Sequence, residues 1–514
     1  MKKAVSLFLA LIIALSVSVT ALASSGDCEC GTLPVVFVHG FGSYAMYIDP
    51  ESDSPESVFP PATDKILKSV PDILKVVNTL FITKNYEKCA DALIDVVKEL
   101  LGGIAFDGNG DPINNIGLLP NELPTVDKHK GHNYDFDTHA ENHADCDQYD
   151  FYYNYLLDPM LNAEYLNDYI TCVKELTNHK KVDLVCHSQG NTIVAAYLQK
   201  YGAGSVNKTV FLSPAYLGLS MVGNLFNENI QLAGKGDAFT LYFSGLLGKD
   251  PAGQLASAII SSLNDACVLP YLLYTFQKLV DAQFNRVFDE ALIEVFGTSP
   301  AVWSFCPDEY YESAKANMFP DTEKYAGLIA KIDDYHYNVQ CKLTDILDSA
   351  ERQGMSFAIC AGYNIPTIPI SGEEEGQSDM LIDTKYMSIG ATGAKPGKIF
   401  GEDYEQKNYA GGINYISPDR IIDASTCAYP DRTWFFKDQG HDKFPAGYIA
   451  FITDLLAHEG QPTVSDMTDY VQFMTTDSDE NIVFIKGPEE KDTRYNIEII
   501  FDSLGQMIAG AFTK

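Results

Sequence analysis

The chain has 514 residues, and its 70 acidic residues outnumber its 36 basic residues, which gives a net charge of −34. So negative a chain is not expected to bind nucleic acid or anionic lipid surfaces, whereas neutral or zwitterionic molecules stay open as ligands. The length alone predicts about three domains, but one large core that carries a long insertion accounts for it better.

The first 23 residues predict a signal peptide. Residues 1–3 carry two lysines, residues 4–19 are apolar, and Ala21-Leu22-Ala23 fits an A-x-A cleavage site. The apolar run is short for a membrane span. Loss of Lys2 and Lys3 with this peptide would change the net charge from −34 to −36. We therefore expect a secreted, soluble protein.

All 11 cysteines follow the predicted signal peptide. An oxidising exterior permits disulfides, but an odd count leaves at least one thiol unpaired. We expect Cys186 to be a free, buried thiol. Cys28 and Cys30 are too close in sequence to pair comfortably with each other.

Residues 34–38 predict the first interior strand, because they form a continuous apolar run rich in β-branched side chains. The run ends in His39-Gly40-Phe41-Gly42, where the glycines would let another molecule approach the backbone closely. A glycine-rich turn without further function would show the same sequence.

Residues 43–150 form a long segment with helical patterns at 64–76 and 86–100. The D-x-N-x-D spacing of residues 107–111 resembles the start of a calcium loop, but Pro112 and the lack of a later Glu favour a simple turn. His129, His132, His139 and His143 lie among carboxylates, as zinc ligands do. A solvated polar loop is the favoured interpretation, and no metal site is predicted.

Residues 186–190, Cys-His-Ser-Gln-Gly, lie between an apolar run at 182–185 and a helical pattern at 191–198. A helix is also predicted at 165–178. A serine between small residues at such a strand-to-helix turn is a nucleophile elbow, which lifts the hydroxyl above the sheet edge. The start of the next helix offers N–H groups and a positive dipole end to a developing oxyanion. An ordinary turn serine is the competing interpretation.

A strand at 210–212 leads into residues 216–350, where apolar side chains recur at helical spacing. Such stripes are usually helix packing, but an apolar helical insertion above a reactive serine also makes a pocket and a lid. Several aromatic residues fit an apolar substrate and a packed core equally well: Tyr271, Tyr274, Phe276, Trp303, Phe305, Tyr310 and Tyr311.

A serine nucleophile needs a base and an acid that orients it. Three of the ten histidines follow Ser188: His336 in a tyrosine-rich stretch, His441 in a Gly-His loop, and His458 at a predicted helix end. The His441 loop lies between an apolar strand at 434–436 and a helix at 446–458, which favours it as the base. After a strand at 356–362, Asp379 is the first choice for the acid and Asp383 the second.

These motifs together resemble the lipase branch of the α/β-hydrolases, which includes lecithin:cholesterol acyltransferase and bacterial triacylglycerol lipases. The similar segments are residues 34–42, 152–159, 182–197 and 299–307, with Ser378-Asp379 and Gly440-His441. The departures from the family pattern are Tyr155-Leu156 for Trp-Arg, Cys186 and Asn191 for glycines, Gln189 for Met, and Met380 for the Gly after the acid.

The resemblance implies an α/β-hydrolase fold, with a mostly parallel central sheet flanked by helices and an inserted helical cap. The expected domains are a core at 24–215 and 351–458, a cap at 216–350, and a small β-rich appendage at 459–514. Within the appendage, residues 471–474, 481–486 and 495–501 have strand-like patterns. They would form a small β module or an added edge of the main sheet.

The resulting hypothesis is a secreted serine hydrolase of carboxylic esters that needs no cofactor. Ser188 attacks the ester carbonyl, His441 takes the proton, Asp379 orients His441, and the N–H groups of Phe41 and Gln189 hold the oxyanion. If water accepts the acyl group from Ser188, the enzyme is a lipase or esterase. If another alcohol accepts it, the enzyme is an acyltransferase. A peptidase or amidase, or an inactive binding protein on the same fold, are the alternatives. The expected partner is a small-molecule or lipid ester, with at most transient contact to a lipid interface.

Overall fold

A computed structural model describes residues 32–119, 136, 148–247, 250–408, 412–488 and 496–512 of the chain. The predicted signal peptide, the four histidines His129, His132, His139 and His143, and Cys28, Cys30 and Cys146 lie outside the described residues. Secretion therefore stays a prediction from residues 1–23.

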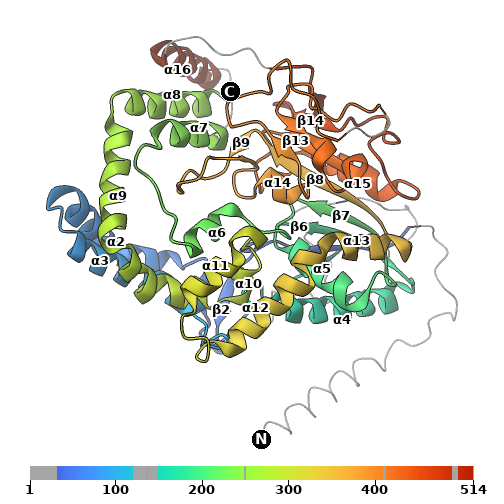
Figure 1. Cartoon of the computed structure of the whole chain (residues 1–514), viewed down its shortest axis with the longest axis horizontal. Helices are drawn as coiled ribbons and strands as arrows, with labels where there is room; N and C mark the ends of the chain where they lie inside the picture. Colours follow the sequence, from blue (N-terminus) through green and yellow to red (C-terminus); the bar gives the residue numbers. More distant parts are fainter. Residues whose placement is uncertain are drawn as a thin grey trace, which may run out of the picture.

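The centre of the molecule is an eight-stranded sheet with the strand order β15-β14-β13-β8-β7-β6-β1-β5 (Figure 1). All neighbouring strands are parallel except β14 and β15. The strands, in chain order, are β1 (Val35–Val38), β5 (Gln148–Phe151), β6 (Val182–His187), β7 (Val206–Leu212), β8 (Ser356–Tyr363), β13 (Thr433–Lys437), β14 (Phe473–Thr476) and β15 (Ile482–Phe484).

Helices cover both faces of this sheet, which explains why its inner strands are continuous apolar runs rather than alternating ones. Residues of α4 (Pro159–Thr177), α5 (Gly190–Tyr201) and α13 (Leu343–Arg352) share one hydrophobic cluster with one face. Residues of α15 (Ala446–Ala457) pack with Trp434 and Phe436 on the other face. This three-layer arrangement confirms the predicted α/β class.

Helix α4 begins six residues earlier than the apolar periodicity predicts. Asp158 accepts a hydrogen bond from the Met160 N–H at 2.9 Å, and Pro159 occupies the first turn. An Asp cap followed by Pro is a helix start signal, so the Asp-Pro pair marked this boundary better than hydrophobic spacing.

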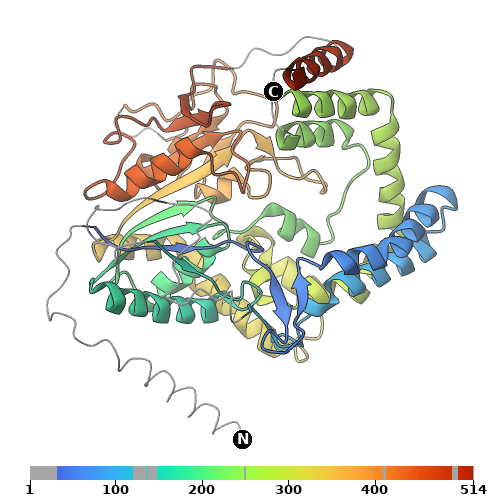
Figure 2. The ribbon, with the colours of Figure 1, turned by 180° about the vertical axis from the view of Figure 1, so that it is seen from behind.

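The segment between β7 and β8 is helical, as predicted. It contains α6 (Ser220–Phe226), α7 (Gly236–Leu247), α8 (Pro251–Asp265), α9 (Val268–Val287), η3 (Phe288–Gly297), α10 (Pro300–Trp303), α11 (Asp308–Met318), α12 (Ala326–Asn338) and η4 (Gln340–Lys342). Figures 1 and 2 show α7, α8 and α9 as an angular frame beside the sheet. No single described helix is long and apolar enough to cross a membrane, although α8 with α9–η3, bent by 71°, meets those criteria as a pair.

Residues 43–119 also contribute to this helical layer. The two helices predicted at 64–76 and 86–100 are present, but their position beside α9 was not predicted. Helices α2 (Thr63–Val77) and α3 (Tyr86–Leu101), joined by η1 (Asn78–Ile82), pack beside the lower part of α9 (Figure 2). Ala90 and Ile94 of α3 share a cluster with Val287 and Ala291. The short η2 (Gly102–Ile104) and a three-stranded sheet of β2 (Met46–Ile48), β3 (Glu56–Phe59) and β4 (Ile116–Gly117) complete this segment.

The predicted C-terminal appendage is partly an edge of the main sheet and partly a helix. Strands β14 and β15 extend the sheet beyond β13, whereas Asn496–Phe512 form α16. The predicted strand at 495–501 is therefore wrong, because Ile497, Ile500, Phe501 and Leu504 follow helical spacing once the window is extended. The Asn496 amide donates to Ser261 Oγ of α8 at 3.0 Å.

Short elements complete the loops after β8 and before β13. They are β9 (Ile365–Pro366), β10 (Gln377–Ser378), α14 (Thr384–Met387), β11 (Thr392–Gly393), β12 (Ile422–Asp423), η5 (Ala424–Thr426) and η6 (Pro430–Arg432).

Candidate active site

Ser188 occupies the sharp turn between β6 and α5 and has a φ of +54°, in the left-handed region that non-glycine residues rarely adopt. Its N–H donates to Leu212 O at 3.1 Å, and its carbonyl accepts from the Asn191 side chain at 2.8 Å. A Cβ on Gly190 would lie 2.2 Å from Val38 O, so the turn needs glycine there. These contacts hold the strained turn that the sequence predicts.

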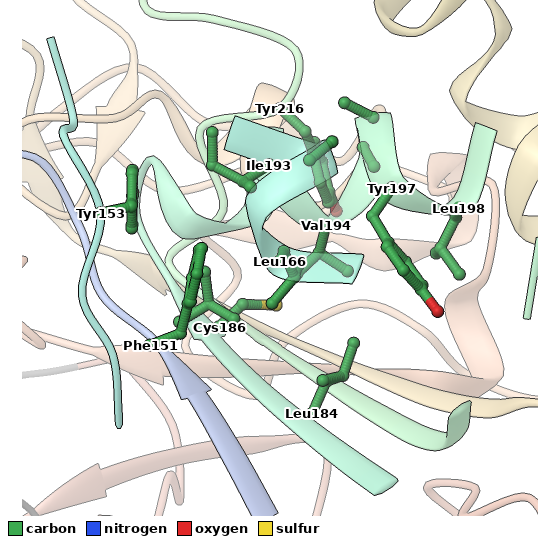
Figure 3. Packing of buried hydrophobic residues seen from close by; sticks show 14 of the residues in the cluster. Phe151, Tyr153, Leu166, Leu184, Cys186, Ile193, Val194, Tyr197, Leu198 and Tyr216 are labelled. Atoms are coloured by element: carbon green, nitrogen blue, oxygen red, sulfur yellow. The ribbon is translucent and has the colours of Figure 1, made fainter. Parts of the chain in front are cut away.

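Cys186 and Asn191, two residues that depart from the α/β-hydrolase pattern that the sequence resembles, contact each other in this turn. Cys186, at the first family glycine, is buried as a free thiol, as predicted. Figure 3 shows its side chain among apolar residues between the sheet and the helices. Its thiol lies 3.2 Å from Asn191 Oδ1, while the Asn191 amide donates to Ser188 O and Leu212 O. Asn191 therefore replaces a glycine with a side chain that braces the turn.

The structure brings Ser188, His441 and Asp379 into one hydrogen-bonded chain. His441 Nε2 lies 2.9 Å from Ser188 Oγ, and His441 Nδ1 lies 2.7 Å from Asp379 Oδ2. Asp379 follows β8 and His441 follows β13, so adjacent parallel strands deliver both side chains to the same edge of the sheet. The His441 N–H also donates to Asp379 O at 3.0 Å, which ties the two loops together.

Burial and charge act against each other on this acid and base. Burial alone lowers the pKa of His441, but the charge and hydrogen bond of Asp379 outweigh it and hold the pKa above its usual value. Burial raises the pKa of Asp379, but His441 and the Leu381 and Ile382 N–H groups outweigh it and hold the pKa low. Asp379 is thus a buried carboxylate placed 2.7 Å from His441 Nδ1, where its charge can stabilise a protonated imidazole.

The pH dependence of any reaction that uses Ser188 and His441 follows from this balance. His441 must be neutral to accept the serine proton, so kcat/KM is expected to fall as pH drops through its pKa, which lies above about 6.5. In Asp379→Asn the two raising effects of Asp379 are lost, whereas burial and the smaller raising effect of the Asp442 charge remain, so the midpoint of the residual activity is expected to move to lower pH. A pH profile of kcat/KM for both proteins measures this. An unshifted midpoint in the variant would disprove the coupling.

His187 is a positioning residue that the sequence did not indicate. Its Nε2 lies 2.9 Å from His441 O, and its ring lies against those of His441 and Phe444. Burial lowers the pKa of His187 to about 3, so the ring is neutral and Nε2–H donates to the His441 carbonyl. The residue before the nucleophile thereby fixes the loop that carries the base.

The backbone N–H groups of Phe41 and Gln189, predicted as oxyanion donors, have no hydrogen-bond acceptor among the described residues. Buried amides are almost always paired, and Gln189 is fully buried at the start of α5. Unpaired amides beside a reactive serine are what an oxyanion needs. Gly40 permits the close approach of this loop, because a Cβ there would lie 2.8 Å from Ser188 Cβ.

Ser188 and His441 open into an apolar cavity of about 330 Å³ between the sheet edge and the cap. Its other lining residues are Phe41, Ala215, Leu219, Met221, Val222, Leu225, Phe226, Phe296, Val302, Phe305, Leu381, Ile382 and Asp442. Of the cap aromatics singled out in the sequence, only Phe305 lines this cavity. Trp303 and Tyr311 are buried in the cap core, while Tyr271, Tyr274 and Phe276 are exposed.

The other residues considered for the acid, the base and a calcium loop make contacts away from Ser188. Asp383, the second choice for the acid, accepts the Ser220 N–H at 2.9 Å, and His458 ends α15. His336 belongs to a separate group in the cap. In residues 107–111, Asp107 Oδ1 accepts from the N–H groups of Asn109 and Asp111, which makes the favoured turn.

Met380, where the family has glycine after the acid, has a φ of +93°. Its N–H donates to Ser378 Oγ at 3.0 Å. Gly362 of β8 makes room for this loop, since a Cβ there would lie 2.6 Å from Asp379 Cβ. Met380 thus adopts a left-handed backbone conformation that a glycine takes more readily, which stores strain beside Asp379.

A mostly parallel sheet with a strained serine after a central strand, and with an acid and a histidine after later strands, is the α/β-hydrolase fold. No family model matches the chain, and no curated protein is similar to it. Among solved structures, the chain is similar to one in the crystal structure of a Tle4-Tli4 complex. The identity is 12%, the TM-score is 0.23, and the match covers 64% of this chain and 75% of that chain. So distant a similarity has no bearing on function.

Proposed function

We propose that this protein is a serine hydrolase that cleaves carboxylic esters with an apolar acyl group. The observation that carries the proposal is the hydrogen-bonded chain Asp379–His441–Ser188, whose serine opens into an apolar cavity. A strained serine, a buried histidine and a buried carboxylate at these distances match the geometry of an activated nucleophile.

In the proposed reaction, Ser188 Oγ attacks the ester carbonyl carbon while His441 Nε2 takes the serine proton. The negative charge on the carbonyl oxygen is held by the N–H groups of Phe41 and Gln189. His441 then gives its proton to the leaving alcohol, and an acyl-Ser188 ester remains. Water, deprotonated by His441, attacks this ester and releases the carboxylic acid, which restores Ser188.

The apolar cavity supports an acyl chain as the group that binds beside Ser188. Most of its lining side chains are hydrocarbon or aromatic, and its volume of about 330 Å³ lies at the lower end for ligand sites. Burial of apolar surface stabilises a bound chain by about 0.8 kcal/mol for each CH₂ group. The rate is therefore expected to rise with acyl length until the cavity is full.

A series of 4-nitrophenyl esters with increasing acyl length tests this assignment. Wild type is expected to prefer medium or long acyl groups over acetate. Val222→Trp places a large ring in the cavity and is expected to lower the long-to-short ratio of kcat/KM by at least about 10-fold. Leu241→Trp is the control, because Leu241 is partly exposed on α7 and does not line this cavity.

The outcomes separate the class of reaction from the class of substrate. If Val222→Trp and wild type hydrolyse the esters with the same chain-length profile, the cavity does not bind the acyl group. The assignment of the protein as a serine hydrolase would still stand. A shift in Leu241→Trp equal to that in Val222→Trp would mean that the profile reflects cap packing and not the cavity.

A further inference from the structure

We propose that Asp308, His336 and Cys341 form a zinc site in the cap, separate from the Ser188 cavity. The three side chains come from the first residue of α11, the end of α12 and the short η4. Each offers one ligand atom of a type that zinc binds in proteins. The proposal does not depend on the proposed esterase activity.

The distances between the ligand atoms match those around a tetrahedral zinc ion. His336 Nε2 lies 3.2 Å from Asp308 Oδ1, and Cys341 Sγ lies 3.4 Å from each of them. Zinc bonds of about 2.0–2.3 Å at tetrahedral angles place such atoms about 3.3–3.6 Å apart. Little movement is therefore needed for one ion to contact all three atoms.

The ring of His336 is held in the orientation and tautomer that a ligand needs. Its Nδ1 lies 2.7 Å from Gln340 Oε1, and the Gln340 amide nitrogen lies 3.4 Å from Ser304 O, an amide orientation in which Oε1 is the acceptor. The proton therefore lies on Nδ1, and the lone pair of Nε2 faces Asp308 and Cys341. The ring also stacks on Tyr311 at 3.6 Å. Such outer contacts are typical of metal-bound histidines.

Without a cation, this arrangement directs too many acceptors at one point. The Nε2 lone pair and the Asp308 carboxylate face each other at 3.2 Å, and Cys341 has one thiol proton to share between them. A divalent cation satisfies all three atoms at once and releases the thiol proton to water.

The surrounding charges tolerate a cation. Lys315 lies near the ring, but its ammonium contacts Asp333 at 2.8 Å and Glu312 at 3.2 Å, so its charge is compensated.

A bound ion would leave one coordination position for water and would join α11, α12 and η4. Asp308 lies three residues after Phe305, whose side chain lines the Ser188 cavity and whose carbonyl accepts the Leu219 N–H at 2.8 Å. The expected role is therefore structural: the metal fastens the segment that carries one wall of the cavity.

The experiment titrates the metal-stripped, reduced full-length protein with Co²⁺ and then displaces it with Zn²⁺. Wild type is expected to bind one Co²⁺ with a thiolate-to-cobalt charge-transfer band, and Zn²⁺ is expected to abolish the band and raise the unfolding temperature. Cys341→Ser should lose the band. Cys172→Ser, which removes another exposed thiol, should keep it. Gln340→Ala should weaken zinc binding about 10–100-fold.

A wild type without the band would overturn the proposal, as would a band that persists in Cys341→Ser. Circular dichroism of each metal-free variant checks that it is folded. Because Cys341 is exposed, its replacement by serine is expected to leave the fold and the fluorophosphonate reactivity of Ser188 intact.

Discussion

Replacing His441 by glutamine is expected to lower kcat for ester hydrolysis by about 10⁵–10⁶-fold. His441 is the described side chain that contacts both Ser188 Oγ and Asp379, so its loss removes the base for attack and the acid for the leaving group. In serine hydrolases, loss of the histidine costs about as much as loss of the whole triad, because the residues act as a unit.

The measurement compares kcat and KM of His441→Gln and wild type on the preferred nitrophenyl ester. His458→Gln is the matched control, since His458 lies at the end of α15 and has no contact with Ser188. KM should change little, because the acyl group binds in the apolar cavity and not to the imidazole. A decrease of less than about 100-fold in kcat would mean that another group serves as the base.

The pair Asp379→Asn and Asp383→Asn is expected to separate the catalytic acid from its close neighbour in sequence. Asp379→Asn should lower kcat by about 10⁴-fold, since an amide beside Nδ1 no longer stabilises the imidazolium and favours the wrong tautomer. Asp383→Asn should lower it by less than about 10-fold, because Asp383 accepts the Ser220 N–H and does not reach His441.

Both variants should be compared for kcat and for thermal unfolding. Asp383 is buried, and burial raises its pKa, so the neutral amide is expected to fold at this position. Equal losses of kcat in folded Asp379→Asn and Asp383→Asn would refute the assignment of Asp379 and indicate a general effect on the loop after β8.

Hydrophobic runs and turn residues predicted the strands that carry the site. The apolar runs at 34–38, 182–185 and 434–436 are inner strands because parallel strands are covered on both faces. Ser188 and His441 could be chosen because each follows such a run. Asp379 and Asp383 are four residues apart on one loop, and only the geometry of that loop, with the φ of +93° at Met380, directs Asp379 toward His441.

Contacts between distant segments were not predictable. The packing of α3 against α9, the ring of His187 against the His441 loop, and the bracing of Ser188 O by Asn191 join residues with no common local pattern. Helix α16 was missed because Tyr495 to Phe501 alternates over a short window, whereas its apolar face becomes visible only over a longer one. Asp308 and His336, two of the proposed zinc ligands, lie on different helices, α11 and α12, so no local sequence pattern joins them.

Labelling with a fluorophosphonate tests the central claim, that Ser188 is an activated nucleophile, most directly. Wild type, Ser188→Ala and Ser349→Ala would be treated in parallel and the adduct located by mass spectrometry; Ser349 lies on α13, away from the cavity. We predict one adduct, on Ser188, in wild type and Ser349→Ala, and none in Ser188→Ala. A folded wild type that stays unlabelled, or an equal adduct in Ser188→Ala, would contradict the account.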